Sequence, residues 1–375
     1  MRSTAAVALV AACAVILGLV VRLLVASSAP APWRAYGYTD LVRVFFLGPV
    51  LELHWPYVLF PFEYHPLLGW TSGLLSLVTT AIGPLVVAWG VVVAFAAAAA
   101  AVLMTRLAPA GRVAAFWSLS PQLWLLGSLN FDAIPVACLV GAAVAARSGR
   151  DALAGAALGL GAAAKLFPLV ALPPLAIALA RDRRARAAAA VAGALVVLAA
   201  IDGPAVLAPY SLLRFGHSPF LLPAPNVDSV FMPLAFALGT VLDPGAADLA
   251  VRAVSAAGLV LTYAWLCLRP ALRGGDPVRL FWVGVVVVLL WSRLYSPQYS
   301  LWVLPAFALF VPDRRIFALL AAGDVATWLG IFGLFGGADL LLVPVLLAGI
   351  FARHAALILL LVALVRRAPI RGSGA

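Results

Sequence analysis

The sequence predicts an all-α, polytopic integral membrane protein with about twelve transmembrane helices and further helices at the outer membrane surface. Of its 375 residues, 65% are hydrophobic and only 10% are charged, whereas soluble domains are about 45–50% apolar and about 25% charged. The apolar residues form continuous runs, which favour helices over the alternating strands of a membrane β-barrel. Spans of about 20 residues each fit this length.

The apolar runs are separated by charged residues and can be followed in order along the chain. They cover residues 5–25, 84–105, 113–129, 132–146, 152–165, 166–181, 187–202, 247–268, 278–293, 298–312, 315–334 and 351–365. Several are shorter than a bilayer crossing, so we expect some helices to be tilted, broken at proline or sheltered by neighbours. The stretches 66–83 and 229–243 are ambiguous, and we expect them to lie in or dip into the outer interface.

The positive charges orient the chain in the membrane. The formal net charge is +11, and basic residues collect in the cytoplasmic loops of multispanning proteins, where they also meet anionic lipids. With an inner N-terminus and the two ambiguous stretches kept outside, the loops at 106–112, 147–150 and 181–186 are cytoplasmic. The basic charge is therefore assigned to topology and membrane lipids, and no nucleic acid partner is expected.

The first apolar run has two possible interpretations. Arg2 precedes it and Ala26-Ser27-Ser28-Ala29 follows it, as in a secretory signal peptide. It is longer than a typical signal-peptide core and Arg22 interrupts its end, which favours a retained first helix. We expect a single domain over residues 1–375, in which two polar outer loops, at about 26–83 and 203–246, contribute the site.

The first loop contains a candidate general base. Asp40 follows the first span in Tyr38-Thr39-Asp40, and Arg43 lies about one helical turn later. A carboxylate there can take a proton from a hydroxyl acceptor, and Arg43 can hold it ionised. An interfacial ion pair or a helix cap explains the same residues without catalysis.

A second motif, Glu63-Tyr64-His65-Pro66, opens the stretch 66–83. A His-Pro start places an imidazole at a helix N-terminus, where backbone N–H groups also favour an anion. Tyr64 and His65 are therefore candidate substrate-binding residues. An ordinary interface helix that begins at proline is the alternative.

Lys165 is the only lysine in the chain and lies between two short apolar runs, where alternation of the spans places the outer surface. A cation in an apolar segment needs a partner or a function, so Lys165 is a candidate to bind an anionic group. Snorkelling to lipid headgroups is the alternative.

The polar turn Ser292–Tyr299 lies between two spans at the outer face. There Arg293 could bind a phosphate, and Gln298 or Tyr299 could line a sugar pocket, although a simple polar hairpin explains the segment equally well. Further substrate-binding candidates on this side are Asn130, Asp132, His217 and Asp228.

Other kinds of site are not indicated. The three cysteines lie in apolar runs without metal-ligand spacing, so neither disulfides nor zinc is expected. The chain contains no HExxH, Walker or nucleophile-elbow motif and no Asp-x-Asp pair, which weakens any metal-dependent mechanism. We expect no metal and no cofactor. Asp324 and Arg353 are harder to place, because a buried hydrogen bond explains Asp324 as well as a function does.

Taken in order, the motifs resemble those of the GT-C superfamily of membrane glycosyltransferases. The closest likeness is to the polyprenyl-phosphate-mannose-dependent enzymes of glycosyltransferase family 87, and the eukaryotic mannosyltransferases that build the GPI anchor have a similar series. The landmarks are Thr39-Asp40, Tyr64-His65-Pro66-Leu67-Leu68, Ser120-Pro121, Asn130-Phe131-Asp132, Lys165-Leu166-Phe167-Pro168, and Ser296-Pro297-Gln298-Tyr299 with Trp302 and Pro305. His65 departs from the pattern, since a second proline is common at that position.

The resemblance implies a GT-C fold in the plasma membrane and an inverting transfer at the extracytoplasmic face. A hexose, mannose by family likeness, would pass from a polyprenyl-phosphate sugar to a glycolipid or glycan acceptor. Asp40 matches the acidic base of the family, and Lys165 and Arg293 match cations that grip the donor phosphate. Arg34, Arg214 and Arg353 are further candidates for that phosphate.

Two other functions remain open from the sequence. A transporter or flippase for a lipid-linked sugar should contain inverted repeats and broken helices that meet at the membrane midplane, whereas the polar residues here gather in outer loops. A non-catalytic membrane scaffold needs no ordered set of an outer carboxylate and cations.

Overall fold

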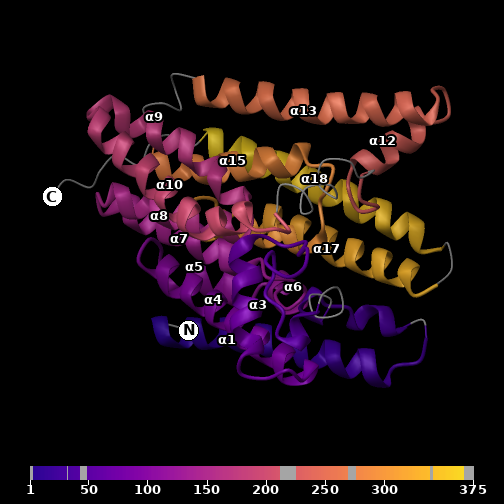
Figure 1. Ribbon diagram of the computed structural model, residues 1–375. Helices are drawn as coiled ribbons and strands as arrows, with labels where there is room; N and C mark the ends of the chain where they lie inside the picture. Colours follow the sequence, from indigo (N-terminus) through magenta and orange to yellow (C-terminus); the bar gives the residue numbers. More distant parts are fainter. Residues whose placement is uncertain are drawn as a thin grey trace.

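The computed structural model describes residues 3–31, 33–42, 49–211, 225–268, 276–337 and 341–366. These residues form a helical bundle in which the long helices lie roughly side by side (Figure 1). The described ranges contain helices, turns and one isolated bridge, but no strand. The predicted all-α class is therefore confirmed.

Within the described residues, six helices are long and apolar enough to cross a membrane, which makes the chain a multi-pass membrane protein. They are α1 (Thr4–Ser28), α4 (Ile82–Thr105), α10 (Arg184–Leu207), α13 (Pro244–Leu268), α17 (Arg314–Phe335) and α18 (Leu342–Arg366). Three shorter apolar helices are α7 (Ala133–Arg147), α8 (Asp151–Ala164) and α15 (Pro277–Trp291). The expected number of about twelve spans is not confirmed.

The remaining described elements are short. They are the α-helices α3 (Pro66–Ser76), α5 (Ala110–Val113), α6 (Pro121–Leu126), α9 (Leu172–Asp182), α12 (Phe231–Leu238) and α16 (Leu304–Leu309), the 3-10 helices η1 (Trp33–Gly37), η2 (Pro49–Glu52), η4 (Phe167–Ala171) and η6 (Pro297–Trp302), and the π-helix η3 (Ala114–Ser118). At about 1.5 Å per residue, α3 and α12 are too short to cross a bilayer as single helices. The interfacial position of 66–83 and 229–243 stays a prediction.

Several apolar runs are divided because proline cannot donate a backbone hydrogen bond and clashes with the preceding turn. The run 113–129 becomes the end of α5, then η3 and α6, and Pro121 begins α6. The runs 166–181 and 298–312 are likewise divided, into η4 with α9 and into η6 with α16. An apolar run in this chain therefore does not always correspond to one straight helix.

The divided segment from α5 to α6 follows α1 over most of its length. The Ser118 hydroxyl donates to the Val7 carbonyl at 2.8 Å near one end of α1. Near the other end, the Arg22 guanidinium donates to the Leu125 carbonyl. The first helix is thus built into the bundle.

Helices α8 and α10 pack at backbone distance. A Cβ atom on Gly155 would lie 1.7 Å from the Ala190 carbonyl oxygen, and one on Gly193 would lie 2.2 Å from that of Ala152. Small residues allow this close approach, which replaces hydrophobic burial as the main source of helix association in lipid.

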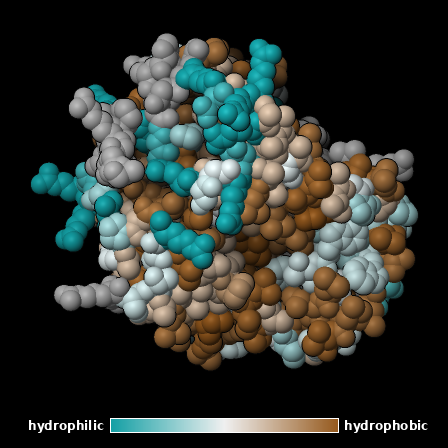
Figure 2. Space-filling view, turned by 90° about the vertical axis from the view of Figure 1, so that its left-hand side faces the viewer, coloured by the Kyte–Doolittle hydropathy of each residue, from teal (hydrophilic) through white to brown (hydrophobic). Residues whose placement is uncertain are grey.

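Arginine-rich helix ends meet at one end of the bundle. Arg147 at the end of α7 pairs with Asp276 before α15, and Arg186 Nε in α10 donates to Asp151 Oδ2 in α8 at 2.6 Å. Hydrophilic side chains gather on this face (Figure 2). Arg147 and Arg186 belong to the loops that the positive-inside rule predicts to be cytoplasmic.

The backbone contact between α8 and α10 gives a paired test. Gly193→Ala should destabilise the protein, since overpacking costs about 1–3 kcal/mol. Gly203→Ala on the same helix has no atom within 4 Å of the new Cβ, so the higher helix propensity of alanine should maintain or raise stability. Thermal melting in detergent distinguishes the two. Equal melting temperatures would contradict the close packing.

Candidate active site

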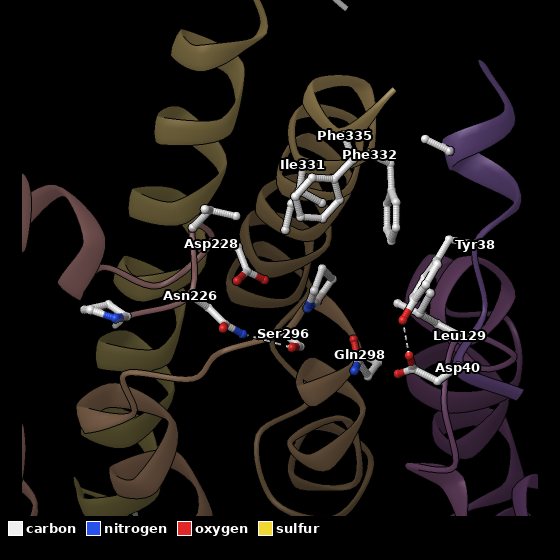
Figure 3. Close-up of a pocket in the computed structure, with 14 residues that line it drawn as sticks. Tyr38, Asp40, Leu129, Asn226, Asp228, Ser296, Gln298, Ile331, Phe332 and Phe335 are labelled. Atoms are coloured by element: carbon white, nitrogen blue, oxygen red, sulfur yellow. Dashed lines mark hydrogen bonds between the residues drawn. The ribbon is translucent and has the colours of Figure 1, made fainter. Parts of the chain in front are cut away.

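A pocket of about 520 Å³ opens at the end of the bundle opposite to the arginine-rich face. The segment after α1, the turn before α12, the turn after α15 and the last turns of α17 contribute its wall. Its polar side chains belong to Asp40, Asn226, Asp228, Ser296 and Gln298, with the phenol of Tyr38 beside Asp40 (Figure 3). Two carboxylates and two amides therefore surround one cavity.

Asp40 is held in place at both its backbone and its side chain. Its N–H donates to the Leu129 carbonyl at 2.8 Å. Its carboxylate accepts from the hydroxyl of Tyr38 through Oδ1 and from Asn130 Nδ2 at 2.6 Å through Oδ2. These donors fix the orientation of the carboxylate toward the pocket.

Buried side chains attach the segment around Asp40 to the bundle. Thr39 Oγ1 donates to the Ser128 carbonyl at 2.6 Å. Arg22, buried in α1, donates to the carbonyls of Tyr38 at 2.7 Å and Tyr36 at 3.3 Å. The charge of Arg22, which marked the end of the first apolar run, thus holds the loop that contains Asp40.

The segment Asn130-Phe131-Asp132 joins Asp40 to Lys165. Asn130 contacts Asp40, and the buried Asp132 accepts from Lys165 Nζ at 2.8 Å through Oδ1. The indole N–H of Trp302 donates to the same oxygen at 2.6 Å. The structure thus brings together four residues that the sequence suggested separately: Asp40, Asn130, Asp132 and Lys165.

Lys165 lies immediately after α8 in extended backbone, with 21% of its side chain exposed. Its ammonium group is 4.1 Å from the centre of the Tyr299 ring. Burial alone would lower the pKa of Lys165, but attraction to Asp132, to Tyr299 and more weakly to Asp40 outweighs it and raises this pKa. Lys165 is therefore a positive charge at neutral pH.

Tyr299 contributes to this cationic site from outside the pocket lining. Its ring stacks on Trp302 at 4.3 Å between centroids, and Trp302 stacks on Phe167 at 3.8 Å. Tyr299 is not among the described residues that line the pocket, whereas its neighbour Gln298 is.

Asp228 forms the wall across the pocket from Asp40 (Figure 3). Its carboxylate lies 3.8 Å from Arg353 Nη2, which also donates to the carbonyls of Asp228 and, at 3.1 Å, Tyr295. Burial raises the pKa of Asp228 to about 6, and the attraction of Arg353 opposes this only in part.

Arg353 is fully buried in α18, with 0% of its surface exposed. Its guanidinium carbon lies 3.9 Å from the centre of the Tyr295 ring. The structure thus places Arg353 behind Asp228 and Tyr295 and not on the pocket wall. An arginine in a membrane helix is a signal for either role, and only the fold distinguishes a supporting position from a ligand-facing one.

Three other predicted residues, Arg293, Tyr64 and His65, do not line the pocket. Arg293 is close to Arg252 and Asp248 of α13; burial and then repulsion from Arg252 lower its pKa, and Asp248 opposes them. Tyr64 packs its ring edge on Phe131 at 5.5 Å. His65 is the N-cap residue of α3, although its side chain makes no capping hydrogen bond.

Asp324 is engaged inside the bundle. It accepts from the Ser300 hydroxyl at 2.6 Å and from Gln122 Nε2 at 3.1 Å. This is the internal hydrogen bonding that was one of the two interpretations of an acid in a membrane helix.

Three predicted site residues, Arg43, Arg214 and His217, lie outside the described residues. In the ranges that are described, no group of three or more His, Cys, Asp or Glu side chains could hold a metal ion.

The sequence analysis did not find the apolar wall of the pocket. Ile331, Phe332 and Phe335 line it from the last turns of α17. Their spacing places them on neighbouring helical positions at the end of a span, which is a usable signal. In a chain so rich in apolar residues, however, this signal does not stand out.

The comparison with protein families agrees with this arrangement. The family model described as Glycosyltransferase family 87 matches residues 62–297. The chain belongs to glycosyltransferase family 87. The resemblance of the motifs to this family is confirmed, and membership makes the protein a membrane-embedded glycosyltransferase, which requires a sugar donor and an acceptor. The match includes Asn130, Asp132, Lys165 and Asp228 but not Asp40. Comparison with curated proteins gives no match.

The raised pKa of Asp228 predicts a pH effect on the stability of this glycosyltransferase. The folded protein binds a proton on the Asp228 carboxyl more tightly than the unfolded chain does. The contribution of protonated Asp228 to the free energy of unfolding is therefore complete below its ordinary pKa near 4 and is lost as the pH rises through about 6. Lowering the pH from 7.5 to 5 should therefore raise the melting temperature of the wild type relative to Asp228→Asn. A difference in melting temperature between the two proteins that is the same at pH 7.5 and pH 5 would contradict the raised pKa of Asp228.

Proposed function

We propose that this glycosyltransferase transfers a hexose, mannose by family resemblance, from a polyprenyl-phosphate sugar to a hydroxyl of a glycolipid or glycan acceptor. The observation that carries the proposal is the orientation of Asp40, which lines the pocket while Tyr38 and Asn130 hold its carboxylate. Asp40 contacts one end of the segment Asn130-Phe131-Asp132 and Lys165 contacts the other, so this segment lies between a base and a cation.

In the proposed reaction, Asp40 acts as the general base. It accepts the proton of the acceptor hydroxyl while that oxygen forms a bond to the anomeric carbon of the donor. The bond between the anomeric carbon and the phosphate oxygen breaks, and polyprenyl phosphate leaves with the electron pair. A direct displacement of this kind inverts the configuration at the anomeric carbon.

Positive charge must meet the phosphate as it leaves, because negative charge develops on it in the transition state. Lys165 is the first candidate, since its ammonium group keeps donors beyond the one given to Asp132 and its side chain is partly exposed. Arg293 is a second candidate at the same end of the bundle. Arg214 is a third candidate from the sequence alone. The buried Arg353 supports Asp228 instead of the phosphate in this proposal.

We assign the site to the extracytoplasmic face of the plasma membrane. The pocket and the arginine-rich face are at opposite ends of the bundle, and the positive-inside rule makes the arginine-rich end cytoplasmic. The lipid tail of the donor would remain in the outer leaflet while its phosphate reaches Lys165.

A transporter or flippase for a lipid-linked sugar was the main alternative. Membership of a glycosyltransferase family and the gathering of polar side chains at one end of the bundle favour transfer over transport. Purified protein incubated with radiolabelled polyprenyl-phosphate sugars and membrane extract tests this directly. Label that reaches no acceptor from any donor would overturn the proposal.

Asp40→Asn should lower the transfer rate by about 10²–10⁴-fold, the usual contribution of a general base. The amide can still accept from Tyr38 or Asn130, so folding and membrane insertion should persist. Glu52→Gln is the matched control, because Glu52 is an exposed acid at the end of η2 in the same outer region. Turnover at the wild-type rate in folded Asp40→Asn would remove Asp40 from the mechanism.

Lys165→Met should lower kcat/KM for the donor by about 100-fold or more, as for the loss of one transition-state donor. Since the change leaves Asp132 buried without its cation, the double variant Lys165→Met with Asp132→Asn tests the same loss without an unpaired charge. Lys165→Arg should recover part of the activity. An unchanged donor KM and kcat in the folded double variant would exclude Lys165 from phosphate binding.

A further inference from the structure

The pocket wall carries buried oxygen atoms that accept hydrogen bonds and lack donors. Asp228 and Gln298 are 0% and 5% exposed, and both line the pocket. Within the described part of the chain, neither carboxylate oxygen of Asp228 nor Oε1 of Gln298 has a hydrogen-bond partner. Arg353 Nη2 comes only to 3.8 Å from the Asp228 carboxylate, although it donates to the backbone carbonyl of Asp228. A buried acceptor that is left without a hydrogen bond costs free energy, so this wall suits a ligand that brings hydrogen-bond donors.

The charges on the wall restrict the class of that ligand. Among the described residues that line the pocket, two are acids, Asp40 and Asp228, and none is lysine or arginine. A phosphate would place negative charge beside two carboxylates with no facing cation, whereas the hydroxyls of a neutral sugar are donors. Lys165 lies behind Asn130 and Asp132, outside this lining.

The opposite wall suits one face of a sugar ring. Ile331, Phe332 and Phe335 of α17 lie above the polar side chains in Figure 3. A pyranose ring has an apolar face of C–H groups that packs on such side chains, while its hydroxyls project from the ring edge toward hydrogen-bonding groups. Pockets of this kind combine an apolar lining with a few placed polar groups.

We propose that Asp228 and Gln298 form the subsite for the acceptor, and that this subsite selects a neutral, polyhydroxylated sugar ring over an acidic one. The proposal rests on the proposed function and divides the site in two. The acceptor ring binds between Asp228, Gln298 and the apolar wall, and presents one hydroxyl to Asp40. The donor phosphate binds beyond Asp40, on the side of Lys165. Arg353 is a positioning residue, because it holds the backbone and the side chain of Asp228.

The test measures binding without turnover. Wild-type protein in lipid nanodiscs is titrated calorimetrically with a butyl glycoside of a neutral hexose and with the butyl glycoside of the matching uronic acid. The neutral glycoside should bind at least tenfold more tightly. Equal or tighter binding of the uronic acid glycoside would overturn the proposal without any variant.

Variants then locate the subsite. Asp228→Asn and Gln298→Met should each raise the Kd of the neutral glycoside by about 10–100-fold, as expected for lost hydrogen bonds to a sugar. Asp228→Asn should also reduce the discrimination against the uronic acid glycoside. Glu52→Gln should leave both Kd values unchanged. Unchanged binding of the neutral glycoside in folded Asp228→Asn and folded Gln298→Met would overturn the assignment.

The two proposals fail in different ways. Binding that depends on Asp228, combined with no transfer of label from any polyprenyl-phosphate sugar, would contradict the proposed function and leave a neutral-sugar site. If transfer depended on Asp40 but acceptor binding did not change in the Asp228 and Gln298 variants, only the proposed acceptor subsite would be contradicted. If polyprenyl phosphate competed with the neutral glycoside, and this competition disappeared in Asp228→Asn, both would bind at Asp228. That result would contradict the division into separate acceptor and donor subsites.

Discussion

The hydrogen bond from Asn130 to Asp40 is the interaction on which the geometry of the site depends. Asn130 begins a three-residue segment whose last member, Asp132, binds Lys165. The carboxylate and the ammonium group are therefore positioned by the same piece of backbone at the start of α7, although they lie 125 residues apart in the sequence numbering (40 to 165). A displacement of this segment moves both groups together, so their separation is less sensitive to motions of the bundle than either position alone.

The ion pair of Asp132 and Lys165 has a cost that its surroundings offset. Removing both charges from water is unfavourable, and their attraction compensates only when further hydrogen bonds satisfy the remaining atoms. Trp302 supplies one such bond to Asp132, and the Tyr299 ring faces the ammonium group. Because Asp132 neutralises Lys165 in the resting protein, the cation can remain charged in an apolar setting until an anion approaches.

The sequence was sufficient for the helical class, the membrane location and the family, since composition and the order of motifs determine them. It also identified Asp40, Asn130, Asp132 and Lys165, which the structure places together. It did not identify Asp132 as the partner of Lys165, because contacts between distant residues depend on how α7 and α8 pack. It did not distinguish the buried position of Arg353 from a ligand-facing one. It expected some apolar runs to be broken at proline but did not say which ones, such as the run that contains Pro121.

The interruption between α6 and α7 has a consequence for how such a site can change. An unbroken helix uses its own carbonyl groups internally, whereas here the carbonyls of Leu125, Ser128 and Leu129 accept from Arg22, Thr39 and the N–H of Asp40. The irregular backbone between α6 and α7 therefore supplies the carbonyl groups to which the segment around Asp40 is hydrogen-bonded. A sequence change that restored regular helix here would keep the protein in the membrane yet release that loop, so selection on activity should preserve the irregularity itself.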